Sequence, residues 1–200
     1  MTERLIIFDL DGTCYPQDSA LTRIIDERTT EFLLNRAGLT SAELAAMEDR
    51  TPSILKALAL LDIPRVQWAT AVYEAVPYQQ LLRQDPALNR ALSRIAAHRI
   101  VVTMAPQRHA LAVLGALGLT AAIDNTISVY ESDHTDKHDI YQALVKEYGA
   151  SRTTVVGDNE ALDLDPAAAL GCGCAHIDPR GRSGAYPVFR DLAQALVALP

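Results

Sequence analysis

The sequence predicts an α/β fold: a doubly wound parallel sheet with a small all-helical cap inserted after its first strand. Short apolar runs alternate with amphipathic helical patterns over most of the chain, which is typical of a parallel sheet covered by helices. One interval, from about residue 19 to about 83, contains only helical patterns. We therefore expect a core domain of residues 1–17 and 86–200 and a helical cap domain of residues 18–85.

Each expected element has its own signal. The run Leu5–Phe8 is continuous and ends at the polar Asp9, as in a strand buried on both faces. The expected strands are 4–9, 99–103, 125–129, 153–157 and 171–177. The expected core helices are 107–117, 136–148 and 160–170, with a long loop at 178–187. The expected cap helices are 21–36, 41–50, 52–61 and 64–82. Thr40 is a candidate N-cap, and Pro52 and Pro64 stand where helices can begin.

The composition predicts a soluble globular protein. Of 200 residues, 49% are apolar and 22% are charged, which disfavours a disordered chain. The apolar stretches are far shorter than the ~20 residues that span a bilayer, and Leu5–Phe8 is too short for a signal-peptide core. The net charge of −7 disfavours nucleic acids and anionic membranes as partners. The odd cysteine count, Cys14, Cys172 and Cys174, lacks zinc-site spacing and fits a reducing cytoplasm.

Polar side chains follow the expected strands at the points where the strands end. In an open α/β sheet, ligands bind outside the carboxyl ends of the strands. The residues expected to meet at this edge are Asp9, Asp11, Thr103, Met104, Lys137, Asp158 and Asp163. Carboxylates gathered in this way repel one another and lose hydration unless a cation joins them. Because oxygen ligands suit a hard divalent cation, Mg²⁺ is the expected cofactor.

Four groups of these residues, in order, resemble the motifs of haloacid dehalogenase superfamily phosphatases. The groups are Asp9-Leu-Asp11-Gly-Thr13, Thr103, Lys137, and Gly157-Asp158 with Asp163. The resemblance extends over about residues 5–177 and implies a Rossmann-like core with a helical cap. Within the superfamily, the stretches 103–114 and 11–15 look most like the pyrimidine 5′-nucleotidase subgroup.

The resemblance implies a reaction through a covalent intermediate on a carboxylate. Asp9 is the expected nucleophile. Asp11 is expected to protonate the leaving alkoxide and then to activate the water that cleaves the aspartyl phosphate. Thr103 is expected to hydrogen-bond a phosphoryl oxygen, and Lys137 to balance the phosphoryl charge while keeping Asp9 ionised. These four residues form the expected catalytic set.

Metal ligands and substrate contacts make two further expected sets. The expected metal ligands are Asp9, Asp11, Asp158 and Asp163. Asp11 would also offer its backbone carbonyl, and Asp163 would bind directly, through water, or only by orienting its neighbours. The expected substrate contacts are Thr103, Met104, Lys137 and His109. Met104 stands where the family usually has Asn, which removes an amide from the phosphate side.

Several neighbouring side chains have structural roles as alternatives. His109 lies on an expected helix, where packing or capping is as good an interpretation as substrate contact. Cys14 is expected to be a packed thiol rather than a reactive one. Tyr73 and Tyr78 in the cap are expected to pack rather than to stack on a base.

These features predict a Mg²⁺-dependent phosphomonoesterase that acts on a small phosphorylated metabolite, preferably a nucleoside 5′-monophosphate and a pyrimidine one first. A sugar-phosphate phosphatase or phosphomutase is the alternative, because it uses the same aspartyl phosphate. A dehalogenase is disfavoured, since Asp11 supplies an acid that carbon–halogen cleavage does not require. A non-catalytic interaction protein would have little need for this set of charged residues. A dinucleotide-binding domain is disfavoured because no Gly-x-Gly-x-x-Gly follows the first strand.

Overall fold

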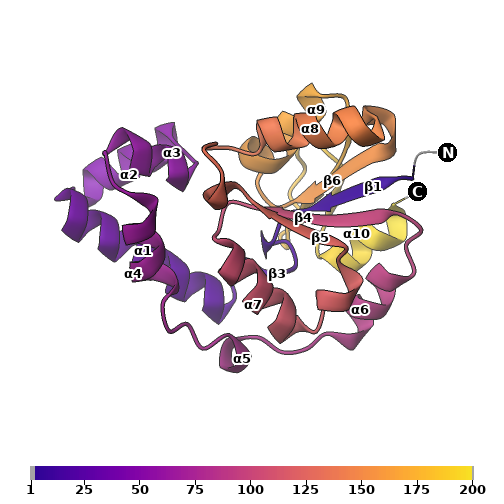
Figure 1. Cartoon of the computed structure of the whole chain (residues 1–200), viewed down its shortest axis with the longest axis horizontal. Helices are drawn as coiled ribbons and strands as arrows, with labels where there is room; N and C mark the ends of the chain where they lie inside the picture. The colour runs from indigo at the N-terminus through magenta and orange to yellow at the C-terminus, as the bar shows by residue number, and fades with distance from the viewer. Residues whose placement is uncertain (1–2, 200) are drawn as a thin grey trace.

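The computed structural model describes residues 3–199 and contains a six-stranded parallel sheet with helices on both faces (Figure 1). The strands are β1 Leu5–Phe8, β4 His98–Thr103, β5 Asn125–Ser128, β6 Thr153–Gly157, β7 Gly173–Ile177 and β8 Val188–Phe189. Their order is β5-β4-β1-β6-β7-β8, with every neighbouring pair parallel. The chain runs outward from β1 on one side and then returns to build the other, which confirms the doubly wound Rossmann-like sheet.

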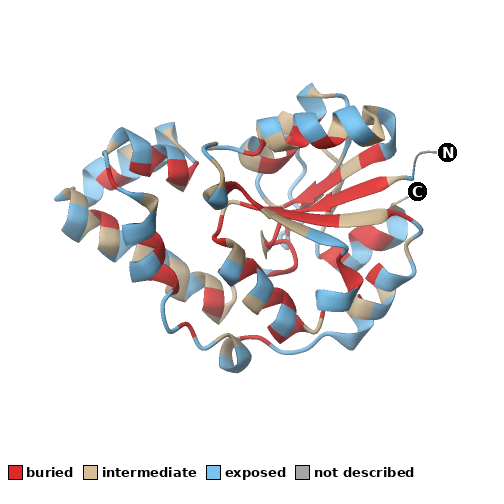
Figure 2. Cartoon of the chain, viewed as in Figure 1, coloured by how far each residue is buried: buried red, intermediate tan, exposed pale blue. Residues whose placement is uncertain are grey.

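The central strand is buried because each of its faces meets a different apolar layer (Figure 2). Successive side chains of a strand point to opposite faces. Leu5 and Ile7 belong to one buried cluster, and Ile6 and Phe8 belong to the other. The core helices are α6 Pro86–Ser93, α7 Gln107–Leu117, α8 His138–Tyr148, α9 Asp165–Ala169 and α10 Leu192–Ala198. Apolar side chains of α6, α7 and α10 share the cluster of Ile6, whereas those of α8 and α9 share that of Leu5.

Five helices follow the first strand, and together we call them the helical cap. In Figure 1, α1 to α4 stand beside the sheet, whereas α5 lies below α7. They are α1 Ala20–Ala37, α2 Ser41–Arg50, α3 Ile54–Leu60, α4 Arg65–Tyr73 and α5 Tyr78–Leu81. Thr40 caps α2 with a complete capping box, in which its side chain and Glu43 satisfy each other's backbone amides. No helix of the described chain has both the length and the apolar character needed to cross a membrane.

Several elements differ from the sequence-based expectation, and the helices α6 and α10 were not predicted. The expected helix 64–82 is broken, because Ala75 adopts a φ of 54° and Pro77 has no amide hydrogen with which to continue a helix. The expected helix 160–170 begins as a π-helical turn, Glu160–Leu164, before α9. The sixth strand, β8, was not predicted, since two residues form no recognisable periodicity.

Short elements complete the chain. A two-residue ladder pairs β2 Asp11–Gly12 with β3 Tyr15–Pro16, directly after β1. Single turns of 3-10 helix lie at Thr120–Ala122, Val129–Glu131 and Ala150–Arg152.

The turn after β1 depends on a residue without a side chain. Gly12 has a φ of 86°, a conformation that L-residues with a Cβ rarely adopt. A Cβ at this position would also overlap the carboxylate of Asp158, which follows β6. The glycine therefore lets the turn after β1 approach the turn after β6 closely.

We expect Gly12→Ala to lower the free energy of unfolding by at least about 2 kcal/mol, because positive φ costs roughly 1–2 kcal/mol and the overlap adds to it. Gly115→Ala is the matched control: Gly115 lies inside α7 with open space around it, so alanine should stabilise by about 0.5–1 kcal/mol. Urea denaturation of both variants measures the two values. Equal stability of Gly12→Ala and the wild type would contradict the close approach described here.

Candidate active site

Asp9 lies immediately after β1, at the carboxyl edge of the sheet. Its backbone amide donates to the carbonyl of Val156 at 2.8 Å, which continues the ladder between β1 and β6 and fixes the position of the side chain. One carboxylate oxygen, Oδ1, accepts a bond from Lys137 Nζ at 2.5 Å. The other, Oδ2, accepts only a long bond of 3.3 Å from Thr13. The Asp9 side chain is thus buried and held in one orientation, and its Oδ2 accepts only a weak hydrogen bond.

Lys137 is a fully buried cation at the start of α8. Its Nζ donates to Asp9 at 2.5 Å and to Asp163 Oδ1 at 2.6 Å. Burial alone would lower the pKa of Lys137, but the negative charges of Asp163 and Asp9 outweigh it and raise the pKa well above its ordinary value. The ammonium therefore stays charged and joins the two carboxylates.

Asp163 lies on the π-helical turn that follows β6, and it is buried rather than on the surface. Its Oδ2 accepts the backbone amide of Asn159 at 3.1 Å, while its Oδ1 accepts the bond from Lys137. At Gly157 a Cβ would lie only 2.5 Å from the Cβ of Asp163. Glycine at this strand end therefore makes room for the Asp163 side chain.

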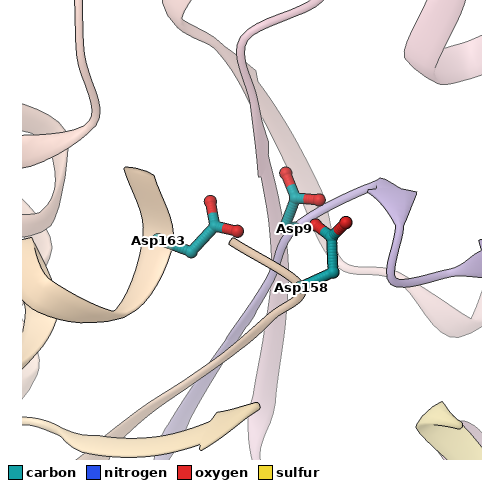
Figure 3. Close-up of side chains that lie close together, drawn as sticks. All are labelled: Asp9, Asp158 and Asp163. Carbon is teal, nitrogen blue, oxygen red and sulfur yellow. The ribbon is translucent and has the colours of Figure 1, made fainter. Parts of the chain in front are cut away.

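Three carboxylates converge at the junction of β1 and β6 (Figure 3). One oxygen from each of Asp9, Asp158 and Asp163 can be chosen so that all three lie within 4.8 Å of one another. Burial, together with the charges of neighbouring carboxylates, raises the pKa of Asp9 to about 7 and that of Asp158 to about 9. Such a group is costly to ionise without a cation, and its oxygen ligands suit Mg²⁺. These residues can hold a metal ion.

Asp11 faces a different set of partners from Asp9. Its Oδ1 accepts a bond from Tyr15 at 2.5 Å and lies 2.8 Å from His109 Nε2, while Thr103 reaches its Oδ2 at 3.4 Å. Burial alone would raise the pKa of Asp11, but His109 and the bond from Tyr15 outweigh it and lower the pKa. The Asp11 carboxylate is absent from the group of three carboxylates described above. Of the expected metal ligands, it is the one whose side chain points elsewhere.

His109 lies in α7 and has no exposed surface. Its Nδ1 is 3.0 Å from the Tyr78 hydroxyl, so both ring nitrogens have partners. The rings of Tyr73 and Tyr78 lie against the imidazole, with centroids 4.7 and 5.4 Å away. The position of His109 therefore differs from the one expected for a substrate contact: it touches Asp11 instead. Both tyrosines pack, as expected.

A cavity of about 300 Å³ opens between the sheet edge and the cap. Core residues that line it include Asp9, Asp11, Thr103, Met104, Lys137, Asp158 and Asp163, so the structure brings these expected site residues together. Thr103 is buried, and its hydroxyl also accepts the Ala105 amide at 3.1 Å. His109 is not part of the lining.

Sequence reasoning missed the cap side of this cavity. Its lining includes Gln17 and the side chains of Thr22, Asp26 and Ile54 from α1 and α3. No signal in the sequence distinguishes Asp26, because α1 carries several other charged residues that are exposed. Cys14 was expected to be a packed thiol. It is buried and donates to the Asp9 carbonyl at 3.4 Å, and burial raises the pKa of its thiol.

Solved structures from several organisms share this architecture. The provisionally assigned HAD-hydrolase YfnB of Bacillus subtilis, crystallised with magnesium, aligns with a TM-score of 0.65 at 14% identity, covering 100% of this chain and 99% of its own. A HAD phosphatase of Thermococcus onnurineus aligns at 0.59 and 18%, covering 98% and 97%. A 2-haloacid dehalogenase of Pseudomonas syringae aligns at 0.52 and 16%, covering 98% of both chains. At these identities the similarity establishes the fold alone.

Sequence comparison identifies the family. None of the curated proteins matches the chain significantly. The family model described as haloacid dehalogenase-like hydrolase matches residues 3–171, which include all the candidate site residues named above. The protein belongs to the haloacid dehalogenase-like hydrolase family.

Proposed function

We propose that the protein is a Mg²⁺-dependent phosphomonoesterase that works through an aspartyl phosphate on Asp9. The observation that carries the proposal is the arrangement around Lys137, which holds Asp9 and Asp163 beside Asp158 in a cavity that Asp11 and Thr103 also line. A phosphate dianion entering this cavity meets a fixed ammonium and a hydroxyl. A carboxylate nucleophile lies next to both.

The first half of the reaction transfers the phosphoryl group to Asp9. Lys137 occupies Oδ1 of Asp9, so Oδ2 attacks the phosphorus atom while the bond to the leaving oxygen breaks. Asp11 gives its proton to that oxygen. The negative charge of the substrate opposes the lowered pKa of Asp11 and favours its protonated form when phosphate is bound. Asp9, Asp158 and Asp163 would hold Mg²⁺, which would supply positive charge to balance the phosphoryl oxygens.

The second half returns the phosphoryl group to water. Asp11, now ionised, accepts a proton from a water molecule that attacks the phosphorus atom, and the bond to Asp9 breaks. The three groups that hold the Asp11 carboxylate, Tyr15, His109 and Thr103, favour this ionised state. Thr103 and Lys137 bind the phosphoryl oxygens in both halves. Inorganic phosphate and an alcohol are the products.

The first substrate class to test is the nucleoside 5′-monophosphates, pyrimidine ones before purine ones, because residues 103–114 resemble that subgroup. Sugar phosphates are the alternative class, and a phosphomutase would return the phosphoryl group to sugar instead of water.

We further propose that residues 18–85 form a cap domain over a core of residues 1–17 and 86–200. We also propose a cytoplasmic location, because the three cysteines are free and disulfides are rare in a reducing compartment.

Removal of divalent cations should abolish phosphate release, because Lys137 alone does not offset the repulsion among the carboxylates and the substrate. We expect activity on a phosphate monoester to vanish in excess EDTA and to return with Mg²⁺, and Asp158→Asn to raise the Mg²⁺ concentration required. A colorimetric phosphate assay measures both effects. Full activity in metal-free buffer would overturn the metal requirement.

Replacement of Asp9 by Asn should reduce kcat by ~10³-fold or more, since the amide keeps the shape but lacks the nucleophilic charge. Asp11→Asn should also be severe, because Asp11 serves both halves of the reaction. Asp49→Asn, an exposed change on α2, is the matched control and should leave kcat unchanged. A freshly purified Asp9→Asn variant, free of deamidation, that turns over at the wild-type rate would exclude Asp9 as nucleophile.

The stability of the metal-free protein should fall as the pH rises from 5 to 9. The pKa values of Asp9 and Asp158 are raised from 3.8 to about 7 and about 9, so the folded chain binds protons that the unfolded chain has lost. This stabilisation is complete below about pH 4 and disappears as the pH passes the folded-state pKa values. Mg²⁺ should reduce the fall, because it stabilises the ionised carboxylates.

Calorimetry with EDTA and with Mg²⁺ measures this dependence as a change of Tm with pH. Asp158→Asn removes one of the two titrating groups and should flatten the metal-free profile. A metal-free Tm that is constant between pH 5 and 9, or a profile that Asp158→Asn leaves unchanged, would contradict the assignment.

A further inference from the structure

The cavity beside Asp9 carries an excess of negative charge. Five carboxylates line it: Asp9, Asp11, Asp26, Asp158 and Asp163. Within the described part of the chain, Lys137 is the only cationic residue of that lining, and it already donates to two of the carboxylates. A bound Mg²⁺ together with Lys137 would still carry fewer charges than the five carboxylates. With all five carboxylates ionised, the lining would therefore be net negative even with Mg²⁺ bound.

Asp26 is the carboxylate that the proposed phosphoryl chemistry does not use. It lies in α1 of the cap, and its side chain is open to the cavity. Partial burial, followed by the negative charges of Asp11, Glu48 and Glu27, raises the pKa of Asp26, and Asp26 forms no salt bridge within residues 3–199. Asp26 thus brings an uncompensated negative charge to the cap side, where the alcohol part of a substrate would lie.

Besides Asp26, the lining on the cap side consists of uncharged residues from the cap helices and of Gln17, which precedes them. They are Gln17, Thr22 and Ile54, which offer an amide, a hydroxyl and an apolar surface. The described lining holds no aromatic ring, and the rings of Tyr73 and Tyr78 pack against the imidazole of His109. Recognition of the alcohol part therefore depends on hydrogen bonds and charge rather than on stacking.

We propose that Asp26 selects the substrate by charge, so that the enzyme accepts phosphate monoesters of uncharged or cationic alcohols and rejects those with a second anion. This inference rests on the proposed phosphatase function and concerns the same site. A carboxylate accepts hydrogen bonds from hydroxyl and ammonium groups, whereas it repels a carboxylate or a second phosphate. Rejection by repulsion is a common source of specificity. Nucleoside monophosphates and sugar monophosphates both satisfy the rule, whereas bisphosphates and phosphorylated acids do not.

The test uses three esters that differ at one carbon: 3-amino-2-hydroxypropyl phosphate, glycerol 3-phosphate and 3-phosphoglycerate. Each is measured as a competitor of p-nitrophenyl phosphate hydrolysis at saturating Mg²⁺, so that a Ki is obtained whether or not the ester is turned over. We expect Ki to rise from the amine to the alcohol to the carboxylate, with about a tenfold difference between the first and the last.

The role of Asp26 is tested by Asp26→Asn, which should reduce that tenfold range to less than about threefold. Glu27→Gln is the matched control: it removes a neighbouring charge on α1 that does not line the cavity, and the range should persist. A wild-type enzyme that binds all three esters equally, or a range that Asp26→Asn leaves intact, would overturn the inference. No hydrolysis of p-nitrophenyl phosphate at all would instead overturn the proposed phosphatase function.

Discussion

The buried ammonium of Lys137 is the interaction on which the rest of the site depends. Asp9 and Lys137 are 128 residues apart in the chain, and their pairing ties the end of β1 to the start of α8. A positive charge at a helix N-terminus is opposed by the helix dipole, and burial of the ammonium costs hydration. Asp9 and Asp163 offset both costs at 2.5 and 2.6 Å. Without the ammonium, Asp9 and Asp163 would lose the positive charge that offsets their mutual repulsion.

Two carboxylates that stand two residues apart acquire opposite properties from their surroundings. Burial raises the pKa of Asp9 to about 7, whereas Tyr15 and His109 lower that of Asp11. Groups whose pKa values are separated in this way can divide nucleophilic and proton-transfer roles. The imidazole of His109 gains its own orientation from the Tyr78 hydroxyl in α5. The state of Asp11 therefore depends on a helix of the cap as well as on the core.

The sequence allowed us to predict the elements with a hydrophobic periodicity and the polar residues that directly follow strands. Asp9, Asp11, Lys137 and Asp158 were predicted to meet because parallel strands align their carboxyl ends, and the cavity brings them together. The break at Ala75 and the two-residue β8 have no periodicity to reveal them. The partners of His109 and the position of Asp26 depend on how the cap lies against the core, which local patterns do not encode. The sequence therefore indicated which strand-end residues lie close together, but it did not indicate the contacts between the two parts of the chain.

The cap also holds the segment that precedes Lys137. From α4, Arg65 donates to the carbonyls of Ser132 at 2.5 Å and His134 at 2.6 Å, and Ser53 donates to that of Thr135 at 2.5 Å. Because these carbonyls lie two to five residues before Lys137, any displacement of α3 and α4 must either carry this segment along or break the bonds. Hydrogen bonds from the cap thus hold the segment that leads into Lys137, whose ammonium orients Asp9.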